Sequence, residues 1–404
     1  MGIIQKTRSL WRSWHGSVVA LSRSAATGGA KKVCAGYCQD LPLAPPLAGG
    51  APPLQRLCFT PSTVVTFLLL RTLSLCLSIP IILRLVYQRW KFGKSFFCVK
   101  PRPTPPPILN DKKWGTHSYV TLKSQGIKLH YVEAGDRNRP LILCVHGFPE
   151  CWFSWRNQLQ EFSSKYWVVA VDLRGYGSSD KPSGRSSYQV DNMIEDLRQL
   201  VGALGKEKCI LMAHDWGAVL AWRLVIQYPD LFTGHISMNG PHPGVFSKHL
   251  RSSFKQMRMS WYIYFFQMPW IPELVFLAED LAVLTQMYRG PKNNVETYPD
   301  EIIEAYKYYF SQDGAWTPPI NYYRNIDFTD STKIPKVKVP TLIVWGTEDM
   351  ALDRRLADKA AEECVFARVK YVEGATHWVQ QDNPKVVNKL VWEFLNSDEW
   401  ISAF

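Results

Sequence analysis

The sequence lacks the cysteine spacing and the glycosylation sites that mark two large classes of protein. Its nine cysteines include no Cys-x-x-Cys pair and are odd in number, which argues against a disulfide framework or a zinc site. It also contains no Asn-x-Ser/Thr sequon, which favours a folded part that stays out of the secretory lumen.

Acidic residues are scarce at the N-terminal end of the chain. Residues 1–117 contain 16 Lys and Arg but only two acids, Asp40 and Asp111, which gives this arm a net charge of +14. The other residues contain 31 Lys and Arg and 33 acids, so their net charge is −2. The positive charge of the chain therefore belongs to the arm, and the folded part offers no basic face for nucleic acid.

The first 57 residues are rich in Ser, Ala, Gly and Pro, and we predict a disordered basic tail over 1–57. An apolar stretch over 62–87 predicts a single-pass transmembrane anchor, although Arg71 and Arg84 leave only 12 uncharged residues between them. An interfacial helix is the alternative.

Basic residues cluster after the predicted anchor, and by the positive-inside rule this predicts that the C-terminal folded part lies in the cytoplasm. The membrane is predicted to be that of the endoplasmic reticulum. Residues 88–113 are basic and then proline-rich, which predicts a stiff linker between the membrane and the folded domain.

The folded domain is predicted to begin at Trp114 as an α/β sheet. Short apolar runs separated by helical patterns are typical of buried parallel strands, and a Gly turn joins the first two runs into an antiparallel pair. The eight predicted strands lie at 120–122, 127–132, 141–145, 167–171, 209–212, 235–238, 341–345 and 368–372. Residues 242–336 are helical and aromatic-rich, so we predict a core over 114–241 and 337–404 with a helical cap inserted over 242–336.

The pentapeptide Ala213-His214-Asp215-Trp216-Gly217 stands between a predicted strand and a predicted helix. Small residues on both sides of Asp215 fit the sharp elbow that presents a nucleophile at the edge of an α/β sheet. Asp before a helix is also a common N-cap, which is the alternative explanation.

An aspartate nucleophile predicts a particular chemistry. A carboxylate can displace at a saturated carbon to form an ester, and water can then cleave that ester at its carboxyl carbon. A serine in the same place would form a stable ether. The elbow therefore predicts either epoxide opening or carbon–halogen cleavage.

Ester cleavage also needs an oxyanion hole and a base that activates water. The backbone amides of Phe148 and Trp216 are the predicted oxyanion donors, because Phe148 follows a strand in His146-Gly147-Phe148-Pro149. His377, after the last strand, is the predicted base, and its position after the nucleophile fits the order nucleophile, acid, histidine.

The acid should follow the preceding strand, where Gly346-Thr347-Glu348-Asp349 lies. We choose Asp349 over Glu348 because it sits farther out on the loop, with Asp353 as the alternative.

Epoxide opening further requires a proton donor for the alkoxide, and a tyrosine can serve because it stays protonated at neutral pH. The predicted cap offers two tyrosine-containing runs, 261–267 and 321–325, among which these arguments alone do not choose. No metal or organic cofactor is required by this chemistry.

Five segments together resemble the epoxide hydrolase branch of the α/β-hydrolase family over residues 114–404, and the predicted anchor resembles its membrane-associated vertebrate type. The segments are HGFPE (146–150), DLRGYGSSD (172–180), HDWG (214–217), NYYRN (321–325) and GATHW (374–378).

The resemblance implies the α/β-hydrolase fold, with Asp215 as nucleophile and Asp349 and His377 as the charge-relay pair. It also implies that Tyr323 and Tyr262 donate the proton, with Tyr264 as the alternative to Tyr262. The expected substrate is a lipophilic epoxide, such as that of a fatty acid, which is converted to a vicinal diol.

Two other functions stay open at this point. A haloalkane dehalogenase would share Asp215, Trp216 and His377, but that branch tends to have Asn in place of Phe148. A membrane-tethered binding protein with an idle catalytic site would keep the fold and turn over nothing.

Overall fold

A computed structural model describes residues 61–327 and 334–397, with side chains from residue 71 on. The tail predicted over 1–57 lies outside the described residues.

Eight strands form one sheet, in the order β1-β2-β4-β3-β5-β6-β7-β8. The pairs β1–β2 and β2–β4 are antiparallel, and all other neighbours in the sheet are parallel. The structure thus confirms the predicted α/β fold with a mostly parallel eight-stranded sheet. The strands are β1 (Thr116–Thr121), β2 (Lys128–Ala134), β3 (Leu141–Val145), β4 (Trp167–Val171), β5 (Cys209–His214), β6 (Phe232–Met238), β7 (Thr341–Gly346) and β8 (Ala367–Val372).

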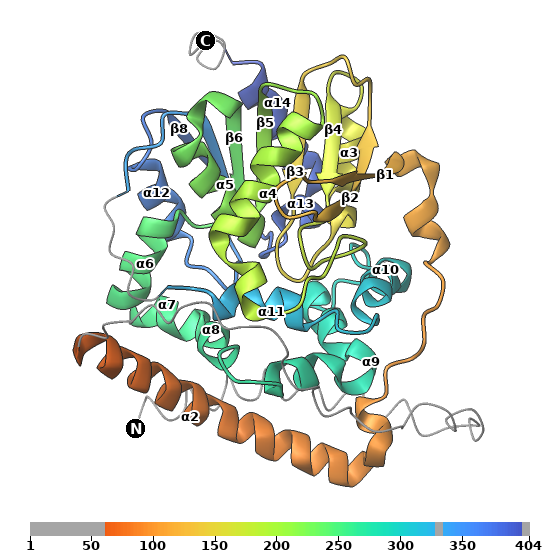
Figure 1. The fold of residues 1–404 in the computed structure, drawn as a ribbon, viewed down its shortest axis with the longest axis vertical. Coiled ribbons are helices and arrows are strands. Elements are labelled where there is room, and N and C mark those ends of the chain that lie inside the picture. The colour runs from red at the N-terminus through yellow and green to blue at the C-terminus, as the bar shows by residue number, and fades with distance from the viewer. Residues whose placement is uncertain (1–60, 328–333, 398–404) are drawn as a thin grey trace. The chain divides into compact units, whose positions relative to one another are not determined.

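Helices cover both faces of the sheet, which explains why β3, β4 and β5 are apolar and buried along their whole length. On one face α4 and α5 pack together, and α3 packs with α14 on the other (Figure 1). The helices of this core are α3 (Arg156–Phe162), α4 (Val190–Ala203), α5 (Asp215–Gln227), α12 (Arg355–Ala361), α13 (Val379–Asp382) and α14 (Pro384–Leu395), with short 3-10 turns η4 (Trp152–Trp155), η5 (Arg185–Tyr188) and η6 (Pro229–Leu231).

The elbow between β5 and α5 has the backbone strain that its sequence predicts. Asp215 has φ +48°, a left-handed conformation that costs free energy in a residue with a side chain. Gly217 lies against the carbonyl oxygens of Val145 and His146, where a Cβ atom would collide with both. The two features together lift the Asp215 carboxylate above the carboxyl edge of the sheet.

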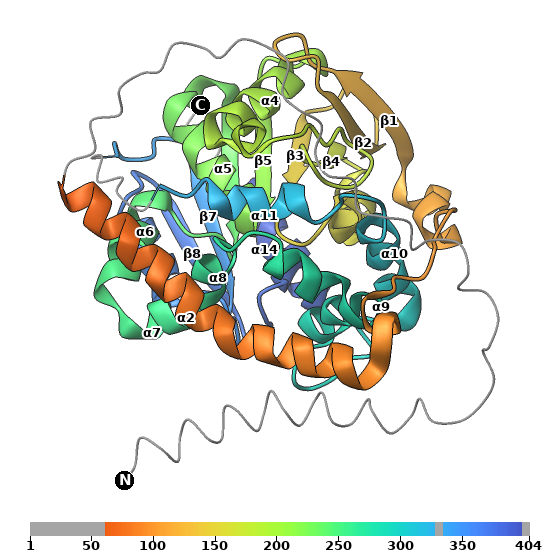
Figure 2. The same ribbon diagram turned by 60° about the horizontal axis from the view of Figure 1, so that its bottom comes forward.

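Among the residues described between β6 and β7, six helices gather beyond the carboxyl edge of the sheet (Figure 2). The long α9 is interrupted, because Ala278 is extended and residues 279–281 are left-handed. The six are α6 (Pro243–Ser252), α7 (Phe254–Met259), α8 (Trp261–Phe265), α9 (Ile271–Arg289), α10 (Asp300–Phe310) and α11 (Thr317–Arg324). We call residues 242–336 the cap.

The segment of the predicted anchor forms the helix α2 (Pro61–Phe92). Within the described residues, the structure contains no helix with both the length and the apolar character that a membrane crossing requires. The anchor over 62–87 therefore stays a prediction.

The segment predicted to be a stiff linker, residues 88–113, contacts the cap. Arg102 makes a bidentate ion pair with Asp280 in the interruption of α9, at 2.8 and 2.9 Å, and its Nε donates to Glu304 of α10 at 2.9 Å. The Arg102 side chain is only 10% exposed. Three 3-10 turns punctuate this segment: η1 (Gly93–Phe97), η2 (Pro107–Asn110) and η3 (Lys112–Trp114). The sequence offered no partner for Arg102, since Asp280 and Glu304 lie far along the chain.

Replacing Arg102 should therefore loosen the cap. We expect Arg102→Ala to lower the free energy of local opening of α9 and α10 by about 2 kcal/mol, because it leaves the Asp280 carboxylate without its bidentate partner. Hydrogen exchange of peptides from these helices measures the change. Lys113→Ala, which removes an exposed ion pair with Asp111, is the control and should have no such effect. Equal exchange in both variants would contradict the prediction.

Candidate active site

Asp215, His377 and Asp349 come together at the carboxyl edge of the sheet. The Nε2 atom of His377 lies 3.3 Å from Oδ2 of Asp215, and its Nδ1 atom lies 2.9 Å from Oδ2 of Asp349. The imidazole therefore stands between two carboxylates, one on the elbow after β5 and one on the loop after β7.

Both carboxylate oxygens of Asp349 accept hydrogen bonds, from its own loop after β7 and from the turn after β6. Its Oδ1 accepts from the amides of Ala351 and Leu352, and its Oδ2 accepts from Nδ2 of Asn239 at 2.6 Å. Asp353 faces other groups, since it pairs with Arg355 at 2.6 Å and with Lys255 at 3.3 Å. Asn239 was not identified from the sequence, although Asn-Gly directly after a strand was an available turn signal.

The charges of this cluster shift its pKa values. Burial lowers the pKa of His377, but Asp349 and Asp215 outweigh burial and raise this pKa well above its usual range. For the Asp215 carboxyl, burial instead raises the pKa. The hydrogen bond and the charge of His377 outweigh burial and bring this pKa below its usual value. In the free protein Asp215 is therefore ionised and faces an imidazolium.

The Asp215 carboxylate also meets a backbone donor. The amide of Phe148 donates to Oδ1 of Asp215 at 2.8 Å, so this amide already contacts the oxygen on which negative charge would develop. Trp216 is the next residue of α5, in the first turn, where amides have no partner within the helix. The Phe148 amide thus lies beside the carboxylate, and the role of the Trp216 amide stays a prediction.

Two cap tyrosines face Asp215. The rings of Tyr323 and Tyr262 pack edge to face with centroids 5.7 Å apart, and the indole of Trp216 packs edge to face against the Tyr323 ring with centroids 5.1 Å apart. Burial raises the pKa of both phenols well above 10, and the negative charge of Asp215 adds to this shift. For Tyr264 the pKa is raised by burial alone, without a contribution from the site carboxylates. The structure therefore brings Tyr262 and Tyr323 to the site.

The neighbours of Tyr323 in NYYRN hold it in position. The Tyr322 hydroxyl donates to the carbonyl of Arg174 in the core at 2.7 Å. Arg324 pairs with Glu273 of α9 and donates to the carbonyls of Phe266 and Met268, which follow α8. Helix α11 is thus fastened to the core on one side of Tyr323 and to the cap on the other.

A buried pair of hydrogen-bonded side chains supports the site. Glu150, the last residue of HGFPE, lies 2.7 Å from Nδ1 of His214, whose Nε2 donates to the carbonyl of His377 at 2.8 Å. Burial raises the pKa of Glu150, but His214 and the amide of Gly147 lower it below its usual value. This pair fixes the backbone of His377 to the elbow, a role that the motif alone did not reveal.

The cap contributes a second support through Gln256 on α7. Its Nε2 donates to the carbonyl of Ala351 at 3.0 Å, and its Oε1 accepts from the amide of Asp353 at 2.8 Å. Gln256 therefore clasps the loop that carries Asp349. No sequence pattern marked this residue, because its partners lie almost 100 positions away.

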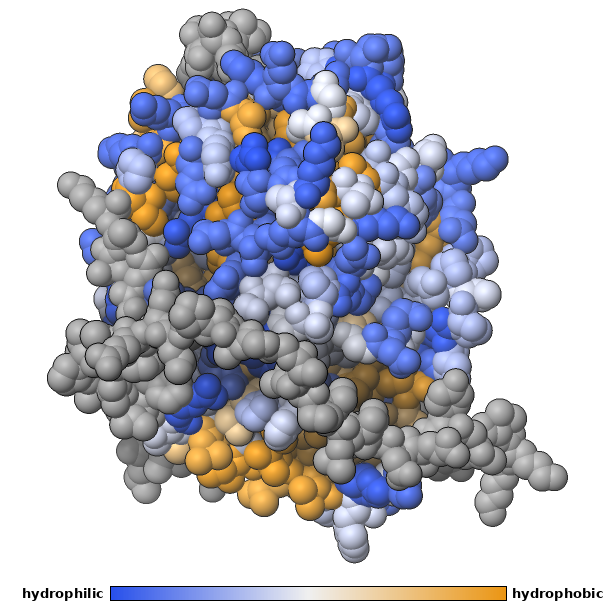
Figure 3. All heavy atoms as spheres, viewed as in Figure 1, coloured by the Kyte–Doolittle hydropathy of each residue, from blue (hydrophilic) through white to orange (hydrophobic). Residues whose placement is uncertain are grey.

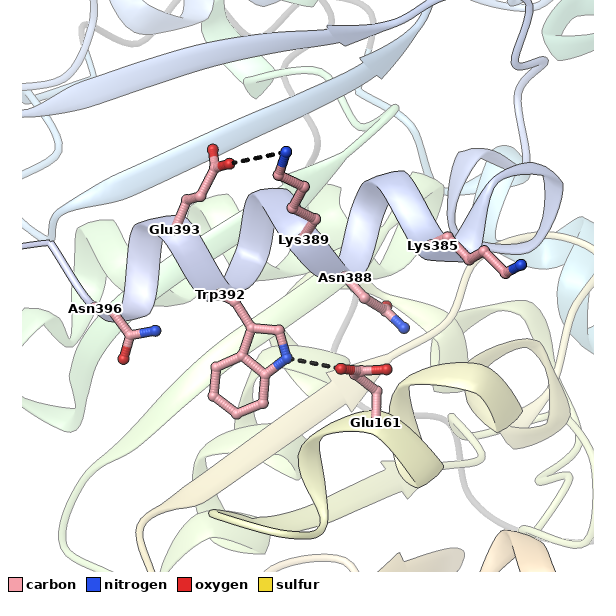
Figure 4. Close-up of a pocket in the computed structure, with 7 residues that line it drawn as sticks. All are labelled: Glu161, Lys385, Asn388, Lys389, Trp392, Glu393 and Asn396. Atoms are coloured by element: carbon pink, nitrogen blue, oxygen red, sulfur yellow. Dashed lines mark hydrogen bonds and ion pairs between the residues drawn. The ribbon is translucent and has the colours of Figure 1, made fainter.

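Two further features bear on function beside this cluster: a surface groove and the capacity to hold a metal ion. A surface groove between α3 and α14 contains Trp392, whose indole donates to Glu161 at 2.8 Å, and none of the predicted site residues (Figure 4). In the part of the chain that the structure describes, no cluster of three His, Cys, Asp or Glu side chains is arranged to hold a metal ion.

Comparison with known proteins agrees with this geometry. Residues 140–384 match the family described as alpha/beta hydrolase fold. Epoxide hydrolase 4 of Homo sapiens is 42% identical over 80% of this chain and 91% of its own length. Epoxide hydrolase 3 of Xenopus tropicalis is 41% identical over 75% of this chain and 84% of its own length.

Solved structures show the same relationship. The crystal structure of Bacillus megaterium epoxide hydrolase in complex with an inhibitor aligns with a TM-score of 0.65 at 31% identity, and it covers 69% of this chain and all of that one. The epoxide hydrolase VrEH1 from Vigna radiata aligns with a TM-score of 0.62 at 28% identity over 70% of this chain and 99% of its own. The chain belongs to the epoxide hydrolase family of the α/β-hydrolase superfamily.

Proposed function

We propose that the protein hydrolyses lipophilic epoxides to vicinal diols through an ester on Asp215. The observation that carries this proposal is the placement of an ionised elbow aspartate between His377 and two protonated cap tyrosines. Nucleophile, base and acid thus surround one point, which is what the two steps of the reaction require.

In the first step an oxygen of Asp215 attacks an epoxide carbon, and the ring C–O bond breaks. The leaving oxygen takes a proton from Tyr323 or Tyr262, which their raised pKa values keep available at neutral pH. The product is an ester of Asp215 with a hydroxyl on the adjacent carbon.

Once ester formation removes the Asp215 charge, the imidazolium of His377 gives its proton to solvent. In the second step the neutral His377 accepts a proton from water, and the hydroxide adds to the carboxyl carbon of Asp215. The amides of Phe148 and Trp216 hold the resulting oxyanion. Collapse of this intermediate releases the diol, whose oxygen takes its proton from His377. The remaining proton of the added water leaves the regenerated Asp215 and restores the tyrosine through solvent.

The surroundings of Tyr323 favour an apolar substrate. Phe148 and Phe266 pack against its ring with centroids 5.1 and 4.9 Å away, and Phe276 stacks on Trp316 close by. An epoxide carried on an aliphatic or aromatic chain fits such a lining better than a charged one does.

We also propose that α2 associates the protein with a membrane. One face of α2 presents exposed apolar side chains at helical spacing, which form the apolar surface at the lower edge of Figure 3, and Lys91 and Lys94 follow them. The stripe consists of Leu75, Ile79, Leu83, Val86 and Trp90. A location at the endoplasmic reticulum, with the catalytic domain in the cytoplasm, stays a prediction.

Trapping the ester tests the proposed reaction most directly. His377→Gln should slow ester hydrolysis by about 10²–10⁴-fold, because it removes the base of the second step. It also removes the charge that lowers the pKa of Asp215, so the incubation is carried out at alkaline pH, where Asp215 stays ionised. Intact mass spectrometry after incubation with a fatty-acid or styrene-type epoxide should show a gain equal to the epoxide. Asp215→Ala is the control and should gain nothing. No adduct with any epoxide of such a panel would refute the proposal.

Replacing Tyr323 by Phe tests the proton donor. We expect alkylation to slow by about 10–100-fold, because Tyr262 remains to donate and the aromatic packing is kept. Single-turnover kinetics with an epoxide measures this rate. Release of chloride from a chloroalkane, which needs no proton donor, would be unaffected in an enzyme that cleaves carbon–halogen bonds. An unchanged alkylation rate with an epoxide would remove Tyr323 from the mechanism.

The charge cluster predicts a shift in the pKa of His377 on alkylation. Two carboxylates raise this pKa in the free protein, and ester formation neutralises one of them, so the pKa must fall and the neutral base becomes available. Asp215→Asn imitates the uncharged ester. NMR titration should give His377 a lower pKa in this variant than in the wild type, with His117, which lies in β1, unchanged as the internal control. An equal or higher pKa in the variant would contradict the mechanism.

A further inference from the structure

The stretch from α7 into α8 has its polarity inverted. Phe254 is 79% exposed, Met257 37% and Trp261 39%. The polar side chains between them, Gln256 and Ser260, are fully buried and hydrogen-bond to each other at 2.8 Å. An ordinary surface helix does the opposite, so these aromatic side chains suit an environment other than water.

Trp270, just before α9, adds a second observation. Its side chain is 76% exposed although its backbone has φ +59°, a conformation that is unfavourable for a bulky residue. An indole exposed to water gains little packing to offset this strain. Contact with a partner outside the protein would supply packing that offsets this strain.

The charge that this segment itself carries has one sign, because residues 231–272 contain no Asp or Glu. From a neighbouring loop, Asp353 pairs with Lys255 at 3.3 Å. Four basic side chains at helical spacing are exposed across α6 and α7. They are Lys248, Arg251, Lys255 and Arg258.

We propose that this part of the cap, which we call the 248–270 surface, docks on an anionic lipid bilayer. Tryptophan and phenylalanine side chains partition favourably into the interfacial region of a bilayer, and Lys and Arg beside them attract acidic headgroups. An acidic protein would satisfy the basic residues but not the separate exposed rings of Phe254 and Trp270.

Two features connect the 248–270 surface to the rest of the protein. Arg71 of α2 donates to the carbonyl of Gln267 at 3.2 Å, so α2 lies against the same part of the cap. Helix α8 also carries Tyr262, so docking brings the proton donors towards the membrane in which a lipophilic epoxide dissolves. This last consequence rests on the proposed function, whereas docking itself does not.

Footprinting of the full chain tests docking without any need for turnover. The protein is oxidised with hydroxyl radicals in buffer, on phosphatidylcholine vesicles and on vesicles that also contain phosphatidylserine, and mass spectrometry then gives the rate at each side chain. On the anionic vesicles we expect oxidation of Phe254 and Trp270 to fall about fivefold. Tyr119 and Phe366 are exposed outside the cap, on β1 and just before β8, and should react equally in all samples.

Variants of the full chain test the role of charge. Lys248→Ala with Arg258→Ala should abolish the dependence of this protection on phosphatidylserine. Lys385→Ala with Lys389→Ala removes the same charge from α14 and should leave the protection intact. Both double variants should hydrolyse a water-soluble epoxide like the wild type, which separates failed docking from failed catalysis.

Two results would overturn the proposal. One is unchanged reactivity of Phe254 and Trp270 on anionic vesicles, which would assign the surface to an acidic protein partner instead. The other is equal protection on both kinds of vesicle, which would attribute the effect to α2 rather than to the 248–270 surface.

Discussion

The site depends on one imidazole held between two carboxylates. Because His377 contacts both Asp215 and Asp349, its charge keeps the nucleophile ionised in a buried setting where a lone carboxylate would take up a proton. The same arrangement makes the basicity of His377 depend on the state of Asp215. One contact can thus prepare both steps: the imidazolium protects the nucleophile before it reacts, and loss of the Asp215 charge frees the base afterwards.

The sheet and the cap carry different groups of the proposed active site. Asp215, His377 and the amide of Phe148 all stand at the carboxyl edge of parallel strands, where a strained turn and buried polar contacts hold them in place. The phenols stand on the cap, which is fastened to the core through Tyr322 and through the clasp of Gln256 on the Asp349 loop. The groups proposed to hydrolyse the ester therefore stand on the sheet, with the cap supporting the Asp349 loop, and the groups proposed to protonate the opened ring stand on the cap.

What the sequence predicted well was local in the chain. The elbow around Asp215 and the runs of buried strands carry their own patterns, because strain demands small neighbours and a doubly covered strand demands apolar residues. Gln256 and the ion pair of Arg102 with Asp280 could not be predicted, since each joins segments far apart that only the folded chain brings together. The selection of Tyr262 over Tyr264 needed the resemblance, because two tyrosines two positions apart on a helix look alike until their burial and neighbours are known.

The polarity of α7 follows from its contact with the Asp349 loop. A helix that must clasp the Asp349 loop needs a polar inner face, and Gln256 provides it at the position where an ordinary helix would bury a leucine. With its inner face committed to hydrogen bonds, α7 has only its outer face left for Phe254 and Met257. The support of the Asp349 loop and the proposed docking surface are thus two faces of one short helix.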